Sequence, residues 1–127
     1  MKSYTDLEQS KKLAEFLPLK SADMCWTNHC YGSIRSSMTV SSKTIEEYKE
    51  LLTRFANLTN IDVFYPCWSL SALLNALPRI VNNETLFVET SPSLWHIGYR
   101  NVYIARAVNL VDACYELILK LHELNLL

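Results

Sequence analysis

The sequence predicts an α+β fold in which helices pack on a three-stranded antiparallel meander and a long amphipathic helix ends the chain. Three runs of β-forming residues follow one another, over residues 85–90, 94–100 and 102–106. The clearest helical pattern of the chain begins directly afterwards, at Asn109. The first half of the chain is mainly helical in pattern and contains two sets of helix-capping residues. Together these observations predict helices that cover one face of the meander.

The composition fits a single globular domain over residues 1–127. Hydrophobic residues make up 50% of the chain and charged residues 20%, which is ordinary for a folded domain and argues against disorder. The formal net charge of −1 does not favour a nucleic-acid-binding protein, because phosphate contacts require a basic surface. Gly32 and Gly98 are the only glycines, so a glycine-rich phosphate loop of the P-loop or Rossmann kind is excluded.

The distribution of apolar residues predicts a cytoplasmic protein without a membrane association. No apolar run approaches the roughly 18–20 residues of a membrane-spanning helix. The first residues lack the apolar segment of a signal peptide. In a reducing compartment the cysteines are expected to be free thiols rather than disulfides. These cysteines are Cys25, Cys30, Cys67 and Cys114.

The first expected helix runs from about Asp6 to Phe16. Thr5 and Glu8 match a capping box, in which Thr5 is the N-cap and Glu8 returns to its N–H group. Pro18 ends the helical pattern, because proline has no backbone donor and clashes with the preceding turn.

A second helix is expected over about residues 45–56, after a less regular segment. Residues 27–42 are rich in serine, threonine and asparagine and predict a hairpin or loop, with weak strands near residues 24–26 and 38–40. Thr44-Ile45-Glu46-Glu47 then matches a second capping box.

The segment from Pro66 to Pro78 is expected to hold the chain together. Ser69 can cap a short helix that ends at Pro78. Trp68, beside its start, is the largest apolar anchor available and is expected to be buried. Four leucines recur at helical spacing and form one apolar face: Leu70, Leu73, Leu74 and Leu77.

The meander and the last helix supply the remaining core. In the middle strand, alternation places Trp95, Ile97 and Tyr99 on one face and Leu94, His96 and Gly98 on the other. In the last helix, Asn109 is the expected N-cap and Asp112 lies favourably in the first turn. The apolar side of this helix includes Leu117 and Leu121.

Two cysteine–histidine combinations of the sequence are candidates for a metal site and for a catalytic nucleophile. Cys25, His29 and Cys30 are close in sequence, but their spacing matches no zinc signature and a fourth ligand would have to be distant. Cys67, just before a helix, could form a nucleophile with His96, although nothing in the sequence brings the two together. No paired carboxylates stand at a suggestive spacing. We therefore predict no catalytic, cofactor-binding or metal-binding residues.

One aromatic and basic group on the meander suggests a binding surface. Tyr99, Arg100, Tyr103 and Arg106 could stack and neutralise single-stranded nucleic acid. The net charge does not support nucleic-acid binding, and an ordinary solvated sheet face explains the same residues more simply.

Several strings of the sequence resemble a family. These are Glu8-Gln9-Ser10-Lys11-Lys12-Leu13, Ser21-Ala22-Asp23-Met24, Pro66-Cys67-Trp68-Ser69-Leu70 with Leu73-Leu74 and Leu77-Pro78, and Asn109-Leu110-Val111-Asp112-Ala113-Cys114. In this order they resemble small proteins of phages, prophages and mobile elements of gut anaerobic bacteria, which have no assigned activity. The similarity covers both ends and the middle, and residues 27–60 are the variable part. It implies a bacterial, cytoplasmic, mobile-element setting and no catalytic residues.

The sequence thus favours a non-enzymatic accessory protein that binds another macromolecule, most simply a protein. Two alternatives from other classes stay open: a small hydrolase that uses a thiol or a histidine, and a single-stranded nucleic-acid-binding module. Whether the chain forms a homo-oligomer also stays open.

Overall fold

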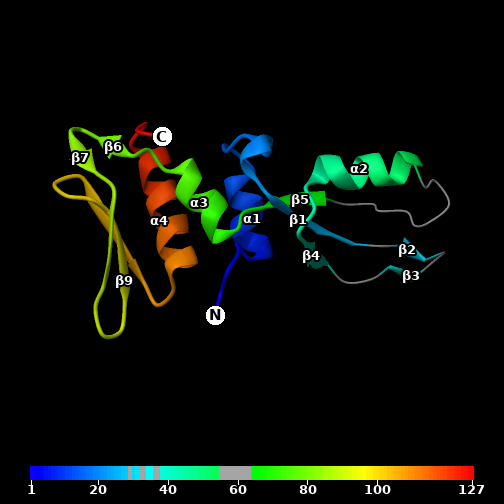
Figure 1. Ribbon diagram of the computed structural model, residues 1–127, viewed down its shortest axis with the longest axis horizontal. Coiled ribbons are helices and arrows are strands. Elements are labelled where there is room, and N and C mark those ends of the chain that lie inside the picture. Colours follow the sequence, from blue (N-terminus) through cyan, green and yellow to red (C-terminus); the bar gives the residue numbers. More distant parts are fainter. Residues whose placement is uncertain (29, 32–33, 36–37, 55–63) are drawn as a thin grey trace. The chain divides into compact units, whose positions relative to one another are not determined.

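The computed structural model combines helices and antiparallel strands, so the expected α+β class is confirmed (Figure 1). The structure describes the chain with the exception of residues 29, 32–33, 36–37 and 55–63.

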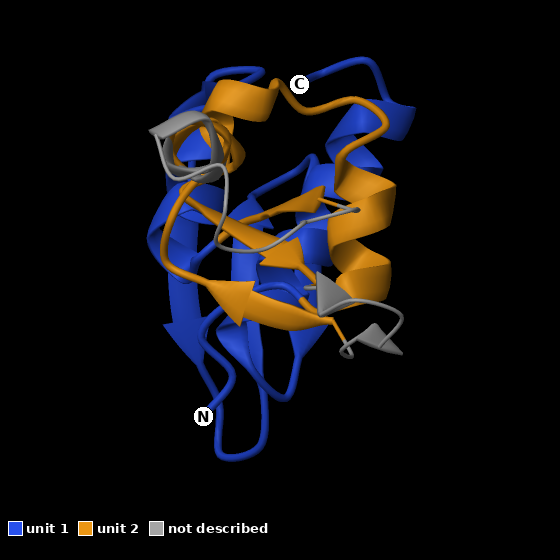
Figure 2. Cartoon of the chain, turned by 90° about the vertical axis from the view of Figure 1, so that its right-hand side faces the viewer, with its two compact units in different colours: residues 1–5, 69–127 blue, residues 6–68 orange. Residues whose placement is uncertain are grey.

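The chain forms two compact units, which Figure 2 colours separately. Unit 1 comprises residues 1–5 and 69–127, and unit 2 comprises residues 6–68. The expectation of one domain over residues 1–127 stays a prediction.

Unit 2 contains two α-helices, one 3-10 helix and five short strands among its described residues. In chain order they are α1 (Leu7–Leu13), η1 (Leu19–Ser21), β1 (Met24–Thr27), β2 (Cys30–Tyr31), β3 (Ile34–Arg35), β4 (Thr39–Ser41), α2 (Ile45–Arg54) and β5 (Phe64–Cys67).

The first helix begins one residue later than the sequence suggested. Asp6 is the N-cap: its side chain accepts from the Gln9 N–H at 2.8 Å, and the Gln9 side chain accepts from the Asp6 N–H at 3.1 Å. This capping box leaves Thr5 fully buried instead of capping. The α-helix ends at Leu13, and the Phe16 N–H bonds to the Leu13 carbonyl three residues back, as in the tighter turns that often end helices.

The second helix begins as expected. The Thr44 hydroxyl accepts from the Glu47 N–H at 3.2 Å, and the Glu47 carboxylate accepts from the Thr44 N–H at 3.3 Å. This reciprocal pair satisfies two groups that would otherwise lack partners at the helix start. The end expected near residue 56 lies outside the described residues.

An antiparallel sheet of three strands forms in the order β4-β1-β5. The sequence predicted its first two strands as weak and did not pair them with the segment before Pro66. Pro66 does not end that segment: it lies inside β5, opposite Cys25. β5 is an edge strand, which is where proline is tolerated in a sheet.

Trp68 is fully buried, as its predicted role as an anchor requires. Its indole N–H donates to the Ser21 hydroxyl at 2.9 Å, and that hydroxyl donates to the Pro18 carbonyl at 2.6 Å. The buried ring therefore has a partner for its one polar group, which buried tryptophan normally needs.

Unit 1 begins with the N-terminal residues and continues after Trp68. Its elements are α3 (Leu70–Ala76), β6 (Ile80–Val81), β7 (Glu84–Thr85), β8 (Phe87–Thr90), β9 (Trp95–Tyr99), β10 (Tyr103–Ala107) and α4 (Leu110–Glu123). A β-bridge between Tyr4 and Ser69 joins the N-terminal residues to this unit, and the Leu70 N–H donates to the Ser3 carbonyl at 3.0 Å.

The short helix α3 has the expected start, and its end falls just short of Pro78. The Ser69 hydroxyl accepts from the Ala72 N–H at 3.2 Å, and the helix ends at Ala76. Of the four leucines expected to share one face, Leu73 and Leu77 are buried, whereas Leu70 and Leu74 are partly exposed. Ala72 takes a buried position beside them.

A tight hairpin joins β6 and β7. Its two loop residues, Asn82 and Asn83, have φ angles of 49° and 66°. Positive φ at both central positions is the mark of a type I′ turn, whose twist suits a hairpin, and asparagine adopts it at little cost.

The predicted meander is present as an antiparallel sheet in the order β10-β9-β8. Tyr99 and Ile97 of the central strand are buried, and α4 contacts β9 and β10. The side chains that share the face of Ile97 and Tyr99 form the inner face of this sheet. The opposite side chains form its outer face.

The C-terminal helix supplies the core of unit 1. The Asn109 side chain accepts from the Asp112 N–H at 2.8 Å, so the expected cap is confirmed. Leu117 and Leu121 are fully buried, as expected, whereas Leu124 is 42% exposed. The other buried members are Val111, Ala113, Cys114 and Ile118. Among the described residues, no helix is long and apolar enough to cross a membrane.

We expect Trp68→Ala to lower the free energy of unfolding by about 3–5 kcal/mol, because it removes a fully buried ring. Trp68→Phe should retain part of this packing but leave the Ser21 hydroxyl without its donor. Urea denaturation measures both. Leu19→Ala is the control, since Leu19 is 47% exposed, and it should change stability by less than about 0.5 kcal/mol. An unchanged midpoint for Trp68→Ala would contradict the anchor.

A chain that ends at Val108 should lose cooperative unfolding, because the three-stranded sheet then loses the helix that packs on it. The finer comparison is Leu117→Ala against Leu124→Ala. The first, fully buried, should cost about 2–5 kcal/mol, and the second, 42% exposed at the C-cap of the helix, should cost less. A sharp thermal transition in the truncated chain would show instead that the helix is a detachable arm.

Candidate functional site

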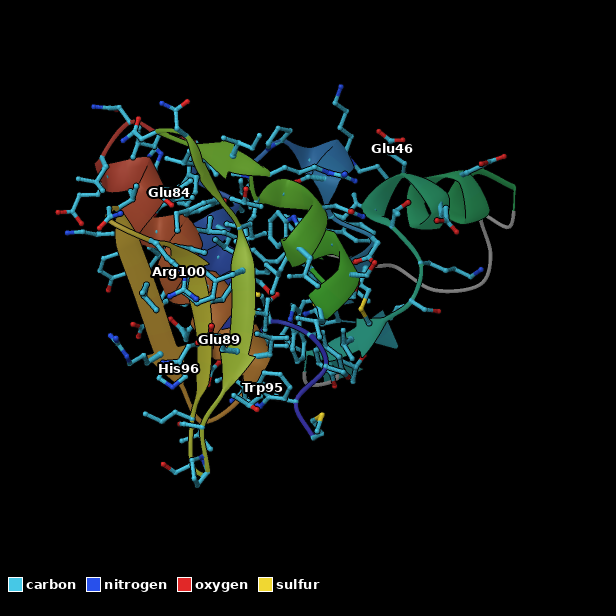
Figure 3. All side chains as sticks on the ribbon, turned by 60° about the vertical axis from the view of Figure 1, so that its left-hand side comes forward. Glu46, Glu84, Glu89, Trp95, His96 and Arg100 are labelled. Atoms are coloured by element: carbon cyan, nitrogen blue, oxygen red, sulfur yellow. The ribbon has the colours of Figure 1, made fainter. Side chains whose placement is uncertain are left out.

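The outer face of the β8–β10 sheet gathers charged and aromatic side chains from three strands. The register places Glu89, His96 and Arg106 opposite one another in a single row across β8, β9 and β10. The neighbouring row contains Phe87, Gly98 and Ile104. Figure 3 shows Glu89, His96 and Arg100 on this part of the sheet. Directly opposed side chains in an antiparallel sheet are about 4.5–5.5 Å apart at Cβ, so neighbouring side chains of one row can interact.

Gly98 is required at the centre of the second row. A Cβ atom at this position would fall on the carbonyl oxygen of Tyr103 and 2.7 Å from the Cα atom of Ile104. No side chain can therefore stand between Phe87 and Ile104. At this point the outer face therefore consists of backbone, flanked by two apolar side chains that are each partly exposed.

Arg100 is held over the first row. Its guanidinium pairs with the Glu89 carboxylate at 2.7 Å and lies 4.4 Å from the centre of the Phe87 ring. Both charged side chains are more than half exposed, at 59% and 57%, so the ion pair itself contributes less than about 1 kcal/mol. The ring contact adds a cation–π interaction of similar size. Together they orient the guanidinium without neutralising the rest of the face.

Arg106 differs from Arg100 in its surroundings. It is exposed, and it forms no ion pair with any residue that the structure describes. Its position opposite His96 makes this end of the row basic. The outer face thus has one arginine with a carboxylate partner and one whose charge is available.

His96 and Ser91 are close enough to suggest a catalytic pair, but they fit a stabilised turn better. The His96 Nε2 atom lies 3.1 Å from the Ser91 hydroxyl. That hydroxyl also donates to the Leu94 carbonyl at 3.3 Å, and the Ser91 N–H bonds to the same carbonyl. The Ser91 hydroxyl is thus shared between the His96 ring and the Leu94 carbonyl of its own turn, and among the described residues no third group orients the ring as a catalytic base requires.

The residues of the predicted binding patch do not share one face. Tyr99 is fully buried and its hydroxyl donates to the Pro78 carbonyl; burial raises the pKa of this phenol to about 12. Tyr103 stands opposite Tyr99, and the Lys120 ammonium of α4 lies 5.6 Å from its ring centre. Arg100 and Arg106 are on the outer face. The two tyrosines therefore cannot stack bases beside the two arginines.

The described thiols lack the surroundings of a nucleophile. Cys25, Cys67 and Cys114 are free and fully buried. Burial raises the pKa of Cys114 to about 12, and it raises the pKa of Cys25 to about 11 with smaller contributions from Cys67 and Glu47. A reactive cysteine needs a lowered pKa and access to solvent.

The structure describes the suggested metal ligands only in part. His29 lies outside the described residues, so the combination of Cys25, His29 and Cys30 stays as the sequence left it. Within the described part of the chain, no group of three or more potential ligands of the histidine, cysteine or carboxylate kind comes together.

Unit 2 carries a shallow pocket of about 120 Å³ at the start of α2. Apolar side chains such as Met24 and Ile45 line it, with Lys20 and Glu46 also contributing. Sites for small molecules usually measure about 300–1,000 Å³, so this pocket is too small to enclose one. The outer face of the β8–β10 sheet is the stronger candidate.

Comparison with known proteins adds no assignment: no family model, curated protein or solved structure matches the chain.

The sequence contained a signal for part of this site. Alternation along β9 separates His96 from Trp95 and Ile97, and the same alternation along β8 and β10 selects Glu89 and Arg106. Phe87 and Glu89 were not named as site residues, because alternation within β8 gives their common face but not the strand register that sets them opposite Gly98 and His96.

We expect the protein to lose stability between about pH 9 and pH 12. The Cys114 thiol has an ordinary pKa of 9.0 in the unfolded chain and about 12 when folded. Its contribution is therefore complete below pH 9 and is lost as the pH rises toward the folded value. Urea unfolding of wild type and Cys114→Ala at pH 8 and pH 10.5, about one unit below and about 1.5 units above the unfolded value, measures this.

The alanine variant should show a smaller fall in the free energy of unfolding over this interval. Tyr99→Phe should remove a further part, because the phenol pKa rises from 10.0 to about 12 on folding. Identical pH dependence in all three proteins would show that these groups ionise as freely in the folded state as in the unfolded chain.

Proposed function

We propose that the protein is a non-enzymatic binding protein and that it recognises another protein through the outer face of the β8–β10 sheet. The observation that supports this is the row of Glu89, His96 and Arg106 with Arg100 held over Phe87. Aromatic and arginine side chains are enriched in protein interfaces. The face offers both, beside the partly exposed apolar side chains of Phe87 and Ile104.

The alternative, a module for single-stranded nucleic acid, has less support. Such modules combine a basic groove with aromatic rings that stack on bases. Here the Phe87 ring already carries a guanidinium, and Glu89 places a negative charge on the same face. The formal net charge of −1 points the same way.

The resemblance noted in the sequence extends the proposal to a setting. We propose on that basis that the protein is an accessory protein of a phage or mobile element and acts in the cytoplasm of a bacterium. An enzyme is disfavoured by the buried thiols and by the bonding of the Ser91 hydroxyl within its own turn.

The test is to capture partners from a bacterial lysate, purify the protein recovered and measure its binding to outer-face variants by calorimetry. Arg106→Glu should weaken binding by tenfold or more, on the order expected when a charge is reversed at an interface. Phe87→Ala should also weaken it. Lys12→Glu, an exposed charge reversal on α1, is the control and should leave the affinity unchanged.

Two results would overturn the proposal. One is a partner whose affinity is equal for wild type and both outer-face variants. The other is tight, salt-dependent binding to a single-stranded oligonucleotide that Arg106→Glu abolishes, which would identify the outer face as a nucleic-acid surface.

A further inference from the structure

The strand β10 is a free edge of the outer-face sheet. Its five residues pair with β9 on one side only. In a β-strand, alternate backbone groups point to either side, so part of the N–H and C=O groups of Tyr103–Ala107 point away from β9. No described residue donates to or accepts from these groups. The edge can therefore accept another strand.

This edge lacks the backbone features that usually block strand addition. It contains no proline, and its register with β9 runs without interruption from Tyr103 to Ala107. Natural edges are commonly protected by bulges, proline or very short strands. The opposite edge, β8, is shorter by one residue and ends just before the turn that contains Pro92.

The charge on β10 selects the partner. Arg106 is its one charged residue, it faces outward, and no described carboxylate pairs with it. On β8 the corresponding residue, Glu89, is already paired with Arg100. A strand added to β10 would place one side chain beside Arg106 and another, on the same face, beside Ile104. A carboxylate suits the first position and an apolar side chain suits the second.

The inner side of the edge carries a second cation. Lys120 of α4 lies over the Tyr103 ring and also pairs with Glu123 at 3.6 Å. Because the Lys120 ammonium already has a carboxylate partner, we expect Arg106 to provide the main attraction for an acidic side chain of the added strand.

We propose that the partner contributes an extended acidic segment that adds to the free edge of β10 as a further strand, with a carboxylate on Arg106 and an apolar side chain on Ile104. This inference rests on the proposed function and makes it specific: main-chain hydrogen bonds hold the segment, and the outer-face side chains select it.

The probes are synthetic peptides of about nine residues, the length of a long strand, in which glutamate and valine alternate along one face and threonine occupies the positions between them. A matched peptide carries lysine in place of glutamate. A third keeps the glutamates but is N-methylated at alternate residues, so that one edge cannot form main-chain bonds. Each is titrated into the full-length protein labelled with ¹⁵N, and amide shifts and hydrogen exchange are recorded.

The glutamate peptide should shift the amides of β10 and slow their exchange. The lysine peptide should bind at least about tenfold more weakly, because it places like charges together. The peptide methylated on its pairing edge should not bind. Arg106→Glu, a substitution at an exposed site, should reverse the preference in favour of lysine.

Three results would overturn the inference. If the methylated and unmethylated peptides bind equally well, the segment contacts side chains only; the proposed function then survives and edge addition fails. If no peptide affects β10, the edge is not a binding site. If β10 exchange slows with protein concentration alone and sedimentation shows a dimer, a second copy of the chain fills the edge.

Discussion

The packing of α4 on one face of the β8–β10 sheet is the interaction on which unit 1 depends. A three-stranded sheet has too little buried surface to be stable alone, and a helix gains most of its stability from the surface that it buries. Leu117, Ile118 and Leu121 are fully buried on α4, and Ile97 and Tyr99 are fully buried on β9. Because one helix covers one face, the other face remains available. The candidate binding surface is therefore a consequence of how the core is built.

The outer face is shaped by a constraint on the backbone as much as by its side chains. Gly98 is needed because the backbone of β10 leaves no space for a Cβ atom. Backbone without a side chain thus separates Phe87 from Ile104 on this face, and the Phe87 ring in turn contacts Arg100. A single glycine thus links the close approach of two strands to the chemical character of the surface.

Unit 2 is organised differently, around polar connections to buried groups. Trp68 is enclosed, and its indole N–H is bound through Ser21 to the Pro18 carbonyl. The β4-β1-β5 sheet ends at the edge strand β5, where proline is tolerated, and Pro66 lies in this strand. The buried Cys25 thiol fits this part of the chain as a packing group, since burial raises its pKa to about 11.

The difference between the two tyrosines and two arginines of the predicted patch shows why sequence proximity is a poor guide to a surface. All four lie within eight residues of the chain, yet register and twist place Tyr99 in the core and Arg106 in solvent. Residues of the candidate site, such as Glu89 and Arg106, are far apart in sequence. They lie in one row only because both strands pair with β9.

Local rules acting within a few residues were sufficient for much of the chain. The sequence by itself determined the α+β class, the meander, the caps Ser69 and Asn109, and the apolar side of the last helix, because each depends on short-range spacing. Tertiary structure alone decided the pairing of β1 with β5, the need for Gly98 and the row of Glu89, His96 and Arg106. These depend on strand register, which is set by long-range packing and turn geometry rather than by any local pattern.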